Sequence, residues 1–248
     1  MVDESDLGYT FPLCTSGTAE GRVADAAGYL SETKVAAEAL FDILRTYRKE
    51  KVRALVDLFN SPGSSMAEAR TKISTVEAHR FARETIAGSI LQMAYHAIDR
   101  YVVVTAKPES VVEFEQQIND CAAHPLPGKS TRLKKPFTYP ANFCTGRQIG
   151  GMPIGLIIFA GRNQYNHAHE KRLQPRTELV FNYLHMLHPE LPSGLSFNIY
   201  DGWGYYAYSI ICALGWVDAE EDGIKLTAYQ RYIRDMNEIL LVDQEGEK

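Results

Sequence analysis

Apolar residues recur at three- and four-residue steps along much of this chain, which is the spacing of an amphipathic helix. The clearest such segment follows Ser31, which we expect to act as the N-cap of a helix that runs to Phe59 and is stopped by the turn residues 60–63. The same spacing predicts further helices at about 65–107, 109–123, 176–187 and 227–241. Helical patterns therefore dominate, and the sequence predicts an all-α protein built as a helical bundle.

Three segments lack this spacing. Residues 1–28 are rich in Gly, Thr, Ala and Asp and predict an irregular N-terminal arm, which precedes a single helical domain over residues 29–248. Residues 124–142 contain four prolines and predict a long loop. Residues 198–216 are rich in Tyr and Trp, and their pattern fits either a helix or a short hairpin. For these aromatic side chains we favour packing in the core over stacking on nucleobases.

A short apolar run, residues 154–160, predicts a buried helix in the middle of the chain. Pro153 suits the first turn of that helix, and we expect the helix to continue into the polar residues 161–170. Gly151 and Gly155 are one helical turn apart, so they would let another helix approach closely.

The charge is uneven along the chain. The 248 residues carry 31 acids and 26 bases, a net charge of −5, which on average argues against nucleic-acid binding. No acid occurs between Asp120 and Glu170, however, and these 49 residues hold six bases, while the other 199 residues carry −11. A buried helix, which excludes acids, would explain residues 149–160 but not the basic loop. We therefore expect an anionic partner, with phosphate the natural choice, and substrate contacts from these basic residues: Lys129, Arg132, Lys134, Lys135 and Arg147.

A candidate catalytic pair, Arg162 and His167, lies inside this acid-free stretch. Asn163 and His167 are one helical turn apart, so the Asn amide could fix the imidazole tautomer by a hydrogen bond. Arg162 and His167 are five residues apart, about 140° around the axis. They could therefore meet only in a cleft that wraps the helix or is shared with a second subunit.

These residue types suit metal-independent cleavage of RNA. A histidine can take the proton from a ribose 2′-OH or give one to the leaving 5′-oxygen. An arginine stabilises the negative charge that builds up on phosphorus. Since the 2′-OH is the nucleophile, we expect neither a metal nor another cofactor.

The hexapeptide of residues 162–167, RNQYNH, resembles the signature of the HEPN superfamily, and residues 85–94 are similar to the helix that packs against that motif. The resemblance implies an all-α bundle, usually dimeric, with two motifs facing each other across the interface. It also implies catalytic roles for Arg162 and His167 and a supporting role for Asn163. Gly161 departs from the family pattern, because a helix former is expected there, and it predicts a loosened helix at this point.

Many HEPN proteins are ribonucleases of toxin–antitoxin, abortive-infection or CRISPR defence systems, whereas others have lost activity and serve as binding modules. The resemblance thus implies a HEPN-type endoribonuclease in a toxin–antitoxin or phage-defence context, with RNA, a second copy of the chain and an antitoxin or other defence protein as partners. A catalytically inactive nucleotide- or RNA-binding or scaffold module is the alternative. A metal-dependent phosphohydrolase is a third, minor one.

The remaining histidines support no metal site. His185 and His188 have a spacing that could share a metal, but a structural role near a helix end is the better interpretation. His169 is either a substrate contact or an exposed bystander. The four cysteines are widely spaced and predict reduced thiols, and the acidic N-terminus and the short apolar runs predict a cytoplasmic protein without membrane contact.

Overall fold

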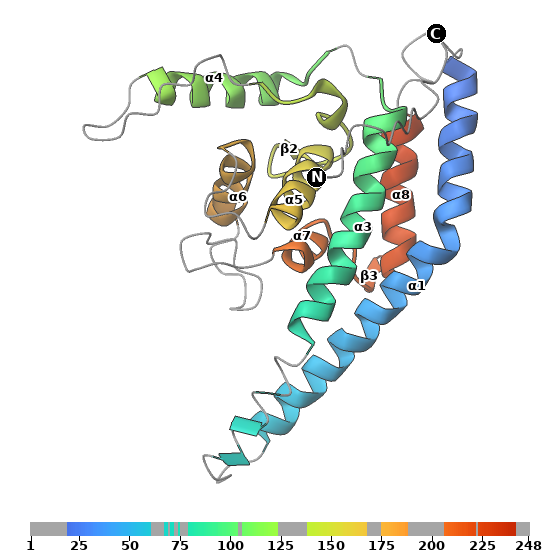
Figure 1. Ribbon diagram of the computed structural model, residues 1–248, viewed down its shortest axis with the longest axis vertical. Coiled ribbons are helices and arrows are strands. Elements are labelled where there is room, and N and C mark those ends of the chain that lie inside the picture. Colours follow the sequence, from blue (N-terminus) through green and yellow to red (C-terminus); the bar gives the residue numbers. More distant parts are fainter. Residues whose placement is uncertain are drawn as a thin grey trace, which may run out of the picture.

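The computed structural model describes residues 19–60, 67–68, 70–71, 74, 79–103, 106–123, 138–167, 175–187, 206–221 and 223–241. The fold is predominantly helical, so the predicted all-α class is confirmed (Figure 1). Its longer helices are α1 (Ala19–Phe59), α3 (Arg80–Tyr101), α4 (Glu109–Ala123), α5 (Ile154–Asn166), α6 (Pro175–Leu187) and α8 (Ala228–Leu241). None of the helices described combines the length and the apolarity needed to cross a membrane.

Helix α3 lies at the centre of the packing. It contacts α1, α5, α8 and the short helix α7 (Ala207–Ala213), and α6 packs on the far side of α5 (Figure 1). Its buried residues follow the three- and four-residue steps of a helix, as at Ala87, Ile90, Leu91 and Ala94, all with no exposed surface. A single apolar core therefore joins the helices on both sides of α3.

Helix α1 begins twelve residues earlier than the sequence predicted. Its first residue is Ala19, so residues 19–28 are helical and Ser31 lies inside the helix rather than at its N-cap. The buried Ala26 and Leu30 extend the buried stripe toward the N-terminus. The prediction of an irregular arm over 1–28 was therefore wrong for its last ten residues, because small alanines carry the pattern there. Residues 1–18 lie outside the described part.

The predicted helix at 65–107 is shorter in the structure. Helix α3 starts after His79 and ends at Tyr101, where Val102 turns to an extended conformation. A run of β-branched valines begins there and disfavours helix continuation. Of the residues between α1 and His79, those described besides Asn60 are helical, at 67–68, 70–71 and 74.

The other predicted helices agree well with α4, α6 and α8. The aromatic segment resolves into α7 over its second half, and residues 198–205 lie outside the described part.

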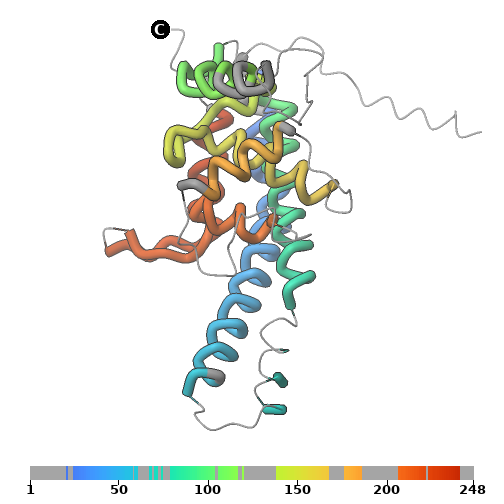
Figure 2. Tube along the Cα trace, turned by 90° about the vertical axis from the view of Figure 1, so that its left-hand side faces the viewer, coloured from blue at the N-terminus to red at the C-terminus, as the bar shows by residue number. Residues whose placement is uncertain are grey.

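Two short antiparallel hairpins were not predicted. Strand β1 (Gln148–Ile149) pairs with β2 (Met152–Pro153) across Gly150 and Gly151, both of which have positive φ. Such angles favour glycine, so Gly151 serves a tight turn rather than a close helix approach. The second hairpin, β3 (Ala219–Glu221) with β4 (Ile224–Leu226), projects from the body (Figure 2).

Candidate functional site

The predicted motif lies at the C-terminal end of α5. Pro153 precedes the helix in an extended conformation, the residues from Ile154 to Gly161 are buried, and the helix runs through Asn166. The expected continuation of the apolar helix into the motif is thus confirmed as far as Asn166. The expected loosening at Gly161 is not seen, because the helix runs unbroken through this residue to Asn166. An added Cβ at Gly161 would lie 3.0 Å from Ile210 and 3.1 Å from Leu91, so α3, α5 and α7 approach closely here.

Arg162 is held against α3 on several sides. Its Nε donates to Oε1 of Gln92 at 3.0 Å, and its guanidinium lies 4.4 Å from the centroid of the Tyr95 ring. Its Nη1 donates to Oδ1 of Asn163 at 3.1 Å. With the Asn166 amide turned so that both of its ends are satisfied, its oxygen accepts from Nε at 3.1 Å and from Nη2 at 3.2 Å. The guanidinium plane is therefore fixed by hydrogen bonds at its edge and an aromatic ring on its face.

Gln92 connects Arg162 to a histidine that the sequence analysis missed. An arginine can only donate, so the oxygen of the Gln92 amide must face Arg162 and its nitrogen must face His96. The two Nε2 atoms of Gln92 and His96 are 2.7 Å apart. Since the amide nitrogen donates, Nε2 of His96 accepts and its ring proton is on Nδ1. His96, which is exposed, is therefore part of the same polar network as Arg162.

Tyr95 lies between this polar network and the apolar core. Its ring packs at 4.7 Å against Phe143 in a tilted arrangement, and the Phe143 ring packs at 5.1 Å against Phe159 of α5. Burial and the charge of Asp99 raise the pKa of the Tyr95 hydroxyl, and Arg162 partly opposes this rise. The side chain is thus an uncharged platform under the guanidinium.

The expected pairing of Asn163 with His167 is not formed by their side chains. The Asn163 amide oxygen accepts from Arg162, and the side chain is buried. His167 ends the helix and bonds to Asn163 through its backbone, N to O at 3.0 Å. None of the contacts that Arg162 makes among the described residues is to His167. The structure thus joins the side chain of Asn163 to Arg162 rather than to His167.

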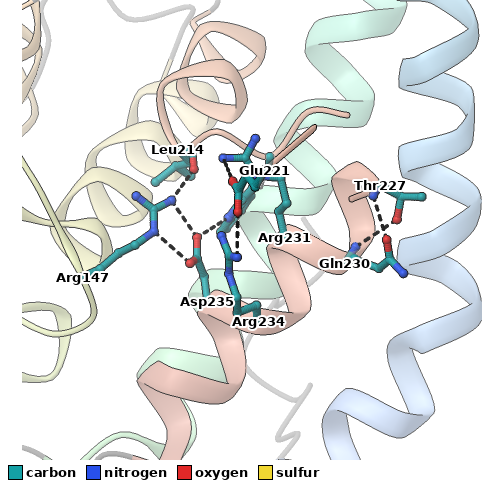
Figure 3. Close-up of polar contacts among 9 residues, drawn as sticks. Arg147, Leu214, Glu221, Thr227, Gln230, Arg231, Arg234 and Asp235 are labelled. Atoms are coloured by element: carbon teal, nitrogen blue, oxygen red, sulfur yellow. Dashed lines mark hydrogen bonds and ion pairs between the residues drawn. The ribbon is translucent and has the colours of Figure 1, made fainter. Parts of the chain in front are cut away.

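Arg147 has a structural partner. Its Nε and Nη2 donate to the two oxygens of Asp235 at 2.9 Å each, and Nη2 also bonds to the carbonyl oxygen of Leu214 (Figure 3). Asp235 is 1% exposed and accepts a third bond from Trp216 Nε1 at 2.8 Å. These contacts assign Arg147 to the fold rather than to a substrate site. Sequence offered no signal for this pair, because the two partners are 88 residues apart.

The remaining predicted substrate contacts lie outside the described residues: Lys129, Arg132, Lys134, Lys135 and His169. Their roles stay predictions. Within the described ranges, no three His, Cys, Asp or Glu side chains are grouped closely enough to hold a metal ion. Cys144 and Cys212 are free thiols.

No family model, no curated protein and no solved structure matches this chain. The chemistry of the site must therefore be argued from its own residues.

Proposed function

We propose that the chain is a metal-independent endoribonuclease of the HEPN type, which acts as a homodimer through Arg162 and His167. The observation that carries this proposal is the immobilised guanidinium of Arg162. Three of its five N–H groups have partners in the described structure, on Gln92, Asn163 and Asn166. Two N–H groups are left for a phosphate, and their orientation is already set before any substrate binds.

In the proposed reaction, His167 removes the proton from a ribose 2′-OH, and the 2′-oxygen attacks the adjacent phosphorus. The bond from phosphorus to the 5′-oxygen breaks, and that oxygen takes up a proton. The products are a 2′,3′-cyclic phosphate and a 5′-hydroxyl. Arg162 stabilises the extra negative charge on the phosphoryl oxygens at the transition state. Because contacts from α3 already hold the Arg162 guanidinium in place, little reorganisation is needed at the transition state, and this favours catalysis.

Orientation supports the dimer in this proposal. Arg162 is turned toward α3, while His167 lies about 140° away at the end of the helix. A second copy could bring its own His167 to the first copy's Arg162. In the defence setting that the motif implies, an antitoxin or another defence protein would hold this activity in check.

The alternative is a silent binding or scaffold module. The observation that favours it is the same network, because an arginine with three internal partners could simply tie α5 to α3. Activity separates the two proposals, since only the first predicts bond cleavage.

The test is cleavage of RNA by the purified chain in EDTA. We expect cleavage with cyclic phosphate ends, and a loss of at least about a hundredfold in each of Arg162→Ala and His167→Ala. Arg53→Ala and His185→Ala, at exposed positions on α1 and α6, are the matched controls and should keep full activity. If the wild type and all four variants leave RNA intact, the silent module is correct. Loss of cleavage on chelation would instead favour the metal-dependent phosphohydrolase.

A further inference from the structure

A second cationic cluster lies on the N-terminal half of α3 and on α1 and α7, which both pack against α3 (Figure 1). Two helices contribute cations in pairs with a spacing of three residues, which places each pair on one helix face. We call the following set the junction cluster: Arg48 and Lys51 of α1, Arg80, Arg83 and Glu84 of α3, and Tyr208 of α7. Electrostatic interactions join its members, because Arg80 and Arg83 act on Glu84, and Arg48 and Arg83 act on Tyr208.

Arg83 is the unusual member. It is only 5% exposed, and its guanidinium lies 5.5 Å from the centroid of the Tyr208 ring. Among the described residues it forms no hydrogen bond and no ion pair at close range. Its nitrogen atoms are not among the buried, unpaired polar atoms of the described residues, so they reach solvent and are open to an anionic ligand.

Glu84 is the one acid among the members of the cluster, and Arg80 and Arg83 act on its carboxyl. This carboxyl is already engaged, since Oε2 accepts from the backbone N–H of Tyr208 at 3.0 Å. Burial raises the pKa of Glu84 to about 7, and the bond from Tyr208 and the charges of Arg80 and Arg83 oppose that rise only in part. Near neutral pH the carboxyl is therefore ionised only part of the time, and the cluster carries a net charge of at least about +3.

Arg48 and Arg80 could reach an external ligand. Both are exposed, and neither forms an ion pair or hydrogen bond within the described part of the chain. The Tyr208 ring covers one face of the Arg83 guanidinium, which leaves the N–H groups along its edge for a ligand. Planar donors of this kind match the oxygens of a phosphate group better than a single point charge does.

We infer that the junction cluster is a phosphate-binding site, separate from Arg162, formed by Arg48, Arg80 and Arg83 with Lys51. Its ligand is a phosphate group, either on the backbone of a single-stranded RNA or on a small phosphorylated molecule. The inference goes beyond the proposed cleavage reaction and does not depend on it. The sequence alone does not reveal this site, because acids separate its bases along the chain. The bases come together only when the antiparallel helices α1 and α3 pack.

The test measures binding without cleavage. A fluorescent RNA whose riboses are 2′-O-methylated cannot be cut by its own 2′-oxygen, so its anisotropy reports binding alone. We expect the double variant Arg48→Gln/Arg80→Gln to weaken this binding about tenfold. The dependence of log K on log salt concentration should become shallower by about 1.4, the value for two lost phosphate contacts on a single strand. Both positions are exposed, so the fold should tolerate the change.

The control is Lys49→Gln/Arg53→Gln, which removes the same charge from exposed positions of α1 outside the cluster. A parallel arm titrates pyrophosphate and follows protection against thermal unfolding. If the cluster variant loses RNA binding relative to the control, the ligand is a polynucleotide backbone. If it loses only pyrophosphate protection, the ligand is a small phosphorylated molecule. If the cluster and control variants behave alike in both arms, the inference is overturned, whether or not the protein cleaves RNA.

Discussion

At the residue scale, the candidate site depends on how one guanidinium is held. Gln92 accepts from Arg162 and at the same time donates to His96, so a single amide contacts both side chains. The Tyr95 ring covers one face of the same guanidinium. A small displacement of a catalytic group can cost about a hundredfold in rate, which makes these supporting residues testable.

Gln92→Ala should therefore impair cleavage although Gln92 has no proton-transfer role. Loss of its oxygen frees the Nε edge of Arg162, and we expect kcat to fall about ten- to a hundredfold with little change in KM. Initial rates on a short RNA in EDTA measure this. Gln116→Ala, at an exposed position of α4, is the control. Wild-type kcat in Gln92→Ala would show that Gln92 does not position Arg162.

Glu84 gives a second residue-scale prediction. Burial raises its pKa from 4.5 to about 7, so the folded state binds more protons than the unfolded state between these values. Stability contributed by this proton is present below about pH 4.5 and is lost as pH rises to about 7. The shift corresponds to about 3 kcal/mol.

Glu84→Gln keeps an oxygen for the Tyr208 N–H and cannot ionise. Relative to this variant, the wild type should lose about 3 kcal/mol of unfolding free energy between pH 4.5 and 8. Urea unfolding of both proteins at these two pH values measures the difference, and other groups that titrate cancel between them. A difference that does not change with pH would show that Glu84 titrates normally.

The chemistry-bearing residues of the motif could be found in the sequence because they are contiguous. Their partners could not, since Arg162 and Gln92 are 70 residues apart and no local pattern links them. The expected contact of Asn163 with His167 is not formed, for a related reason. Helical spacing placed it beside His167, but the neighbouring Arg162 is the stronger donor and takes its oxygen.

At the scale of elements, sequence patterns worked where large apolar residues define a helix face. Helices α4, α6 and α8 agree with prediction to within one residue at the ends described. The start of α1 was missed because its face is made largely of alanine, and the hairpins were missed because two- and three-residue strands have no periodicity. Gly155 was identified as a point of close approach by another helix, and its nearest neighbour is the end of the short 3-10 helix η1 (Ala141–Phe143), followed by the carbonyl of Thr145.

Gly155→Ala tests that approach. An added Cβ would collide with the carbonyl oxygen of Phe143 and lie 3.2 Å from that of Thr145, both in backbone that cannot rotate away. We expect a loss of about 2–3 kcal/mol of unfolding free energy. Gly28→Ala is the matched control, because nothing lies within 4 Å of its added Cβ in α1. That control should gain up to about 1 kcal/mol from helix propensity, and equal effects in the two variants would refute the packing argument.

At the scale of the whole molecule, the net charge of −5 conceals two basic regions. One is the acid-free stretch that the sequence reveals, and the other is the junction cluster that only the fold assembles. Helix α3 links them, because its Gln92 contacts Arg162 and lies about two and a half turns after Arg83 of the junction cluster.

The proposed dimer can be tested directly, because composite sites and sites within single subunits predict different activities for a mixed dimer. Helical spacing separates Arg162 and His167 by about 140° in one copy, so the proposed composite site takes Arg162 from one subunit and His167 from the other. A dimer that combines one Arg162→Ala subunit with one His167→Ala subunit would then contain one damaged site and one intact site. Sites confined to single subunits would both be damaged.

The decisive measurement is the RNA cleavage rate of that mixed dimer in EDTA, after purification through two different tags. If the site is composite, the mixed dimer should cleave at about half the wild-type rate per dimer. The two parent homodimers should be inactive, and the wild type should cleave. A mixed dimer as inactive as its parents would contradict the composite site, and a wild-type chain that leaves RNA intact would contradict the proposed activity itself.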